Sequence, residues 1–156
     1  MYFYRADYKD SIIGTTDNPN LYNYKPKGYE VVKKSYWKKK RERKIKTALK
    51  ISPGSLATTW RFVPTAKSKD DGAQVDLLFD SLDDTITICE IKYACDEYAI
   101  DKTYAHKLLK KMEIFRKRTR TKKQLFLVMV TTFGLKQTMY SEEIVTNQVT
   151  LDDLFK

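Results

Sequence analysis

The segment GAQVDLLFD (residues 72–80), followed after a short turn by TITICEIKY (residues 85–93), decides the fold of this chain. Both segments are short and mainly apolar, the second is rich in β-branched residues, and the turn between them reads SLDD (residues 81–84). Such runs, bounded by turn formers, are typical of strands. The pattern predicts two antiparallel strands joined in a hairpin.

Three charged residues stand out because the hairpin is otherwise mainly apolar. Strand side chains alternate between faces, so Glu90 and Lys92 share one face, and Asp76 shares a face with Leu78 and lies opposite Val75. We expect Asp76 to lie near Glu90. Two such carboxylates can hold Mg²⁺, which lowers the pKa of a bound water and neutralises charge at a phosphate. Lys92 would position or deprotonate that water, or stabilise the transition state.

The alternative is structural, because buried charges need partners. A cross-strand salt bridge of Lys92 with Asp76 or Glu90 accounts for the same three residues without any catalysis.

The rest of the chain predicts helices packed on a mixed sheet. Apolar periodicity and end signals place the other elements as follows: helix over 29–51, strand over 58–63, helix over 101–119 capped by Asp101, a strand buried on both faces over 124–132, and a short strand or helical turn over 149–155. The first thirty residues carry tyrosines and turn formers, and Tyr2–Tyr8 is a candidate short strand. The order of elements predicts an α/β fold with a mixed sheet.

Positive charge is concentrated in one segment of the chain. Residues 25–50 contain twelve basic and two acidic residues, whereas the remainder is balanced at eighteen of each. Such a segment attracts a polyanion, although a solvated helix face explains the same charge run. The residues that we expect to bind nucleic acid are Lys38, Lys39, Lys40, Arg41 and Arg43.

Composition excludes several other classes of protein. No apolar run approaches the roughly 20 residues of a membrane span, and the N-terminus lacks a signal-peptide pattern, so we expect a cytoplasmic protein without a membrane partner. Cys89 and Cys95 are interpreted as ordinary thiols. His106 is the only histidine, which argues against a serine or cysteine hydrolase.

The hairpin resembles the PD-(D/E)XK nuclease superfamily, which has the restriction-endonuclease-like fold. The likeness is carried by GAQVDLL (residues 72–78) and CEIK (residues 89–92), and it extends specifically over about residues 44–156. More narrowly, the chain is similar to the C-terminal nuclease-like domain of a group of bacterial and archaeal AAA-type ATPases. The chain contains no G-x-x-x-x-G-K-[ST] motif, so it cannot itself be a P-loop ATPase.

The resemblance implies an αβββαβ core in which Asp76, Glu90 and Lys92 are catalytic. It implies Mg²⁺ or Mn²⁺ as cofactor, held by Asp76 and Glu90, with Gln74 within reach of the site. The superfamily usually adds a glutamate from the first helix. Glu30 is our candidate for that metal ligand, and Glu42 is the alternative.

These observations predict an N-terminal extension over residues 1–30 and a nuclease-like domain over residues 31–156. The expected function is metal-dependent hydrolysis of phosphodiester bonds in nucleic acid, with DNA as the first candidate. The alternative is an inactive module on the same fold that binds nucleic acid or docks an ATPase. A homodimer is compatible with either.

Overall fold

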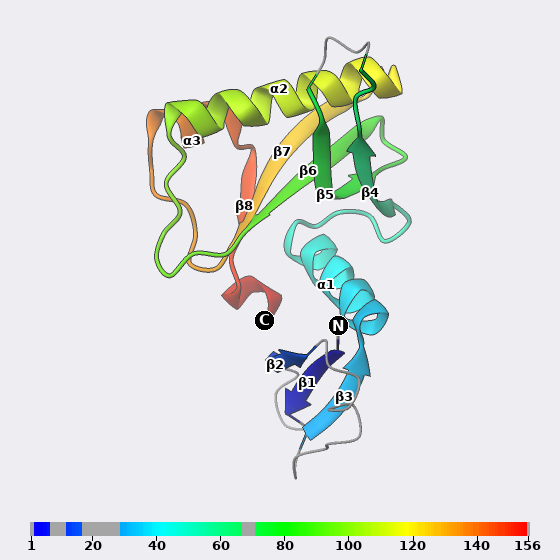
Figure 1. The fold of residues 1–156 in the computed structure, drawn as a ribbon, viewed down its shortest axis with the longest axis vertical. Helices are drawn as coiled ribbons and strands as arrows, with labels where there is room; N and C mark the ends of the chain where they lie inside the picture. Colours follow the sequence, from blue (N-terminus) through cyan, green and yellow to red (C-terminus); the bar gives the residue numbers. More distant parts are fainter. Residues whose placement is uncertain (1, 7–11, 17–28, 67–70, 156) are drawn as a thin grey trace. The chain divides into compact units, whose positions relative to one another are not determined.

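The computed structural model describes residues 2–6, 12–16, 29–66 and 71–155, with side chains from residue 39 onward (Figure 1). It divides into two compact units, Met1–Arg43 and Lys44–Lys156. The division falls inside helix α1 (Lys34–Ala48), whereas we expected a boundary at residue 30. Each unit is described by itself.

The first unit contains a three-stranded antiparallel sheet. Its strands are β1 (Tyr2–Ala6), β2 (Ile12–Thr16) and β3 (Tyr29–Lys33), in the order β2-β1-β3. The short strand expected within Tyr2–Tyr8 corresponds to β1.

The helix that we expected from residue 29 begins only at Lys34, so that part of the prediction is wrong. Residues 29–33 pair with β1 instead, and Glu30 lies opposite Arg5. Val31 and Val32 favour an extended backbone, and pairing with β1 supplies the hydrogen bonds that a helix would otherwise make.

The second unit is built on a five-stranded mixed sheet, which confirms the α/β class. The strands are β4 (Leu56–Phe62), β5 (Ala73–Asp80), β6 (Thr85–Lys92), β7 (Gln124–Thr131) and β8 (Asn147–Val149). Their spatial order is β4-β5-β6-β7-β8. β4, β5 and β6 are antiparallel neighbours, whereas β7 runs parallel to both β6 and β8. The expected hairpin is therefore present as β5 and β6.

Helix α2 (Lys102–Thr119) makes the crossover between the parallel strands β6 and β7 and covers one face of the sheet (Figure 1). It begins where the sequence predicts, because the Asp101 carboxylate accepts a hydrogen bond from the Tyr104 N–H at 2.7 Å. Ile88, Leu108, Phe115 and Leu127 belong to the core on this face. The charged residues of β6 are therefore placed on the side of the sheet that α2 covers.

The opposite face has its own core, formed by Leu77, Phe79, Cys89 and Val128 around Ile45 from the end of α1. β7 contributes to both cores, with Leu127 on one side and Val128 on the other, as expected for a strand buried on both faces.

The C-terminal segment contains a helix that we did not expect. α3 (Met139–Ile144) begins with a capping box in which Thr138 and Ser141 exchange hydrogen bonds. β8 and a single 3-10 turn, η2 (Asp152–Leu154), follow it. Among the described residues, no helix combines the length and the apolar character that crossing a membrane requires.

Candidate active site on strands β5 and β6

A β-bulge places Asp76 at an irregular point of the sheet. The register between β4 and β5 pairs Thr58 with Leu78 but Trp60 with Val75. One residue of β4 therefore lies against two residues of β5, Asp76 and Leu77. Bulges re-aim side chains and are common beside active sites.

The bulge corrects one of our expectations about strand faces. Val75 and Leu78 belong to the same core, on the α2 side of the sheet, whereas strict alternation puts them on opposite faces. The extra residue in β5 reverses the alternation between these two positions. Asp76 therefore lies at the bulge itself, between Val75 and Leu78, whose side chains both face α2.

Asp76 also lies where β5 separates from β6. The pairing between these strands runs from Asp80↔Ile86 to Leu77↔Cys89. One step further, Asp76 Oδ2 accepts a hydrogen bond from the Ile91 N–H at 3.4 Å. This half-buried carboxylate is thus held beside Glu90 and Lys92 by the backbone of the neighbouring strand. The contact places the Asp76 carboxylate at the backbone between Glu90 and Lys92, and the approach of the two carboxylates to each other stays a prediction.

Glu90 is the buried centre of the site, with an exposed fraction of 4%. Tyr104 of α2 donates its phenolic hydrogen to Glu90 Oε1 at 2.8 Å. Lys111, two turns further along α2, pairs through Nζ with Glu90 Oε2 at 2.5 Å. Lys92 Nζ lies 3.3 Å from Glu90 Oε1 and 5.0 Å from the centre of the Tyr104 ring. We call Asp76, Glu90, Lys92, Tyr104 and Lys111 the carboxylate cluster.

The electrostatics of the carboxylate cluster keep Glu90 ionised. Burial acts to raise the pKa of Glu90, but the hydrogen bond and charge of Lys111, the Tyr104 hydroxyl and the charge of Lys92 outweigh burial and lower that pKa. The pKa of Tyr104 is raised. Burial is the largest cause, followed by the negative charge of Glu90 and by the hydrogen bond that Tyr104 donates to Glu90. Asp76 adds a smaller contribution in the same direction, which places it within electrostatic range of Tyr104.

The residues present fit a divalent cation with a limited set of protein ligands. Asp76 and Glu90 offer hard carboxylate oxygens on neighbouring strands, and Mg²⁺ is commonly held by one or two carboxylates together with water and substrate phosphates. Each Glu90 oxygen already has a partner, but a carboxylate has about four acceptor positions. Among the described side chains, no three acidic, histidine or cysteine residues gather into a metal site.

Of the two candidates for a third metal ligand, Glu30 and Glu42, only Glu42 lies on the first helix. Glu30 lies on β3 in the first unit, so its assignment to a helix is wrong, and its side chain lies outside the described residues. Glu42 lies on α1, also in the first unit.

The remaining predicted residues occupy less informative positions. Gln74 is exposed on β5, where its backbone pairs with Arg61 of β4. The basic residues Lys39, Lys40, Arg41 and Arg43 lie on α1 in the first unit, with Lys39 and Arg43 exposed. The side chain of Lys38 lies outside the described residues.

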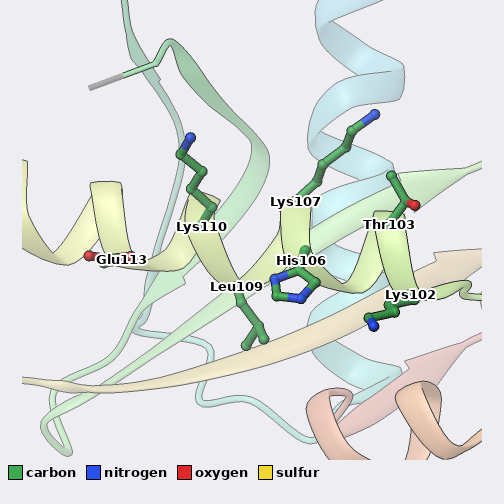
Figure 2. Close-up of a pocket in the computed structure, with 7 residues that line it drawn as sticks. All are labelled: Lys102, Thr103, His106, Lys107, Leu109, Lys110 and Glu113. Carbon is green, nitrogen blue, oxygen red and sulfur yellow. The ribbon is translucent and has the colours of Figure 1, made fainter. Parts of the chain in front are cut away.

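A surface hollow along α2 is separate from the carboxylate cluster. Seven exposed residues of this helix line it: Lys102, Thr103, His106, Lys107, Leu109, Lys110 and Glu113. Figure 2 shows Lys107 and Lys110 extending to one side of the helix and Leu109 to the other. His106 lies here among lysines.

Tyr104 and Lys111 are the site residues that we did not predict from the sequence. In the sequence, Tyr104 belongs to the apolar stripe of the helix, so it is expected to pack in the core. Lys111 is one of several lysines expected to lie in solvent. Their seven-residue spacing places both on one side of the helix, because seven residues make about two turns. That spacing is the only signal that pairs them, and it does not name Glu90 as their common partner.

Comparison with known proteins adds no assignment. No family model matches the chain, and neither the curated proteins nor the solved structures contain a significant match. The interpretation of this site therefore rests on its own geometry and chemistry.

Proposed function

We propose that the second unit hydrolyses phosphodiester bonds in nucleic acid, using a divalent metal ion on a restriction-endonuclease-like scaffold. The observation that carries the proposal is the position of Asp76. It lies at a bulge, where β5 leaves β6, beside a buried ionised glutamate and a lysine two residues further along β6. Two acids and a lysine at one strand end are the groups that this chemistry needs.

The order of the elements supports the same proposal. From residue 44 to residue 131 the chain runs helix, three antiparallel strands, helix and parallel strand, which is the expected αβββαβ order. The β5–β6 hairpin and the crossover helix α2 occur in the order expected of the scaffold that the sequence resembles. Fold alone does not specify an activity, so the weight rests on the carboxylate cluster.

Each residue of the carboxylate cluster takes a distinct role in the proposed reaction. Asp76 and Glu90 would hold the metal ion, which when bound lowers the pKa of a water and neutralises charge at the phosphate. Lys92 is one-third exposed and can reach a substrate phosphate while it stays close to Glu90. Tyr104 and Lys111 position Glu90 and maintain its charge. DNA is the first substrate to test.

The test is Mg²⁺-dependent cleavage of labelled single-stranded and duplex DNA and RNA. We expect Lys92→Ala to lose at least about a hundredfold in rate, the scale of removing one group that stabilises transition-state charge. Lys107→Ala is the matched control, because this exposed lysine lines the hollow on α2 and lies outside the carboxylate cluster. Rapid cleavage by folded Lys92→Ala, or none by the wild type on any substrate, excludes the proposal.

A second candidate function is binding of nucleic acid without cleavage. It is favoured by the partners of Glu90, since Lys111 and Tyr104 already satisfy both oxygens without a metal. The two functions differ in their response to Mn²⁺. Calorimetric Mn²⁺ binding that disappears in Asp76→Asn supports the nuclease, whereas identical titrations of the two proteins, with retained nucleic-acid binding, support the non-catalytic module.

A further inference from the structure

A second basic surface lies on the nuclease-like unit, and the overall charge balance conceals it. Residues 102–123 contain ten lysines and arginines but one acidic residue, Glu113. Acidic residues elsewhere in the chain offset this excess of positive charge in the net charge outside residues 25–50. The densest part is RKRTRTK (residues 116–122), which forms the end of α2 and the start of the loop to β7.

The basic residues of this segment are on the surface. Arg116, Lys117, Arg118, Arg120 and Lys122 are all exposed. Some of them also have partners within the chain: Arg116 donates to the Lys123 carbonyl at 3.3 Å, and the Arg118 guanidinium lies 4.1 Å from the centre of the Phe62 ring. The Lys123 side chain is held by Asp80 at 2.7 Å and by the Ser81 carbonyl. We call residues 116–122 the α2-end surface.

The helix dipole explains only part of this charge. Cations in the last turn stabilise a helix, and Arg116, Lys117 and Arg118 occupy that turn. Arg120 is the C-cap residue and still lies at the helix end, whereas Lys122 lies two residues beyond it, where the effect of the dipole falls away. The dipole therefore does not account for the whole basic run.

The backbone of Arg120 supplies an independent indication of function. Arg120 is the residue after the helix and adopts a left-handed conformation with φ of 55°. Glycine is the usual residue at this position because side chains with a Cβ are strained there. An arginine at such a position keeps a charge at the expense of stability, and strain of this kind is concentrated at functional sites.

We propose that the α2-end surface binds the sugar–phosphate backbone of nucleic acid, with Arg120 as a principal contact. This inference rests on the nucleic-acid substrate of the proposed function and names a surface that holds it. Arginines present a planar fork that matches phosphate oxygens. Thr121, which lies between Arg120 and Lys122, has a hydroxyl that can also donate to a phosphate oxygen, whereas the Thr119 hydroxyl donates to the Phe115 carbonyl at 2.8 Å. A run of exposed cations fits a regularly spaced polyanion.

The test measures binding and stability together on the full chain, in EDTA so that cleavage cannot interfere. The probe is a labelled 20-nucleotide DNA, single-stranded or duplex, followed by fluorescence anisotropy. Arg120→Gly should weaken binding about eightfold at 0.1 M salt and reduce the salt slope by about 0.9, as loss of one phosphate contact requires. The same substitution should raise the melting temperature by about 2–4 °C, because it relieves the left-handed strain.

Two control variants separate charge from strain. Asp84→Gly relieves the same strain at φ of 57° on the exposed hairpin turn without removing a cation, so it should not weaken binding. Arg120→Lys keeps the charge and should retain most of the affinity.

Three results overturn the inference: no binding by the wild type, unchanged affinity and salt slope in Arg120→Gly, or equal competition by polyglutamate of matched charge. Mg²⁺-dependent cleavage is scored separately, so failure of the nuclease proposal and failure of this surface give different results.

Discussion

Lys111 and Glu90 form an ion pair between helix α2 and strand β6, with 2.5 Å between Lys111 Nζ and Glu90 Oε2. Glu90 is almost fully buried, whereas the Lys111 side chain keeps one-fifth of its surface exposed. The pair joins the crossover helix to the strand that carries the proposed catalytic residues. It therefore links the stability of the fold to the charge of the site.

Loss of the Lys111 ammonium should destabilise the fold. We expect Lys111→Met to lower the free energy of unfolding by about 2 kcal/mol, the scale of a hydrogen bond to a charged group. A double-mutant cycle with Glu90→Gln isolates the pair, and urea unfolding measures each corner. A coupling energy indistinguishable from zero would show that the ion pair does not hold α2 on the sheet.

The same substitution should strengthen the binding of a divalent cation. The Lys111 ammonium occupies Glu90 Oε2 and repels a cation placed between Asp76 and Glu90. We expect Lys111→Met to bind Mn²⁺ about tenfold more tightly than the wild type, which corresponds to about 1.4 kcal/mol. Calorimetry measures the affinity, and Lys110→Met is the control on the neighbouring helix position. Weaker Mn²⁺ binding by Lys111→Met would mean that the lysine supports the metal site and does not compete with it.

The carboxylate cluster should make stability depend on acidity. The pKa of folded Glu90 lies below its ordinary value of 4.5, because Lys111, Tyr104 and Lys92 together outweigh the effect of burial. A lowered folded-state pKa means that the unfolded chain takes up the proton first as the pH falls. The contribution of Glu90 is therefore complete above pH 4.5 and disappears as the pH falls through the lowered value.

The measurement is the difference in unfolding free energy between the wild type and Glu90→Gln, taken from about pH 7 to about pH 3. This difference should be constant near neutrality and should shrink in acid. A difference that grows as the pH falls would contradict the lowered pKa of Glu90.

The two cysteines should differ sharply in reactivity. Cys89 is buried in the core on the face opposite α2, and burial raises the pKa of its thiol to about 12. Cys95 is exposed. An aromatic disulfide reagent should therefore modify one thiol per native chain and two after denaturation, because the thiolate is the reactive form. Rapid modification of both thiols in the native protein would contradict the register of β6.

Much of the second unit follows from local patterns in the sequence. The alternating runs of β5 and β6, the continuous apolar run of β7 and the cap at Asp101 all predict their elements close to the observed bounds. The hairpin alone also predicts that Asp76 lies beside the end of β6, where its carboxylate accepts a hydrogen bond from the Ile91 N–H. These features depend on contacts between residues close in sequence, which periodicity and turn chemistry report directly.

Features that depend on distant contacts could not be predicted in this way. The bulge at Asp76 arises from pairing with β4, and it reverses the face expected for Val75. Residues 29–33 form a strand because β1 is available to pair with them. The positions of Tyr104 and Lys111 depend on how α2 packs across the sheet, so nothing near them in sequence identifies Glu90 as their partner.

The central claim is that Asp76 and Glu90 form a metal-dependent catalytic site, and the Mg²⁺-dependent cleavage rate of Asp76→Asn tests it most directly. The substitution keeps the shape of the side chain and its acceptor oxygen for the Ile91 N–H, but it removes the charge that would hold a cation. The expected result is cleavage by the wild type and a rate at least about a hundredfold lower in a folded Asp76→Asn. Equal rates in the two proteins, or no cleavage by either, would contradict the claim.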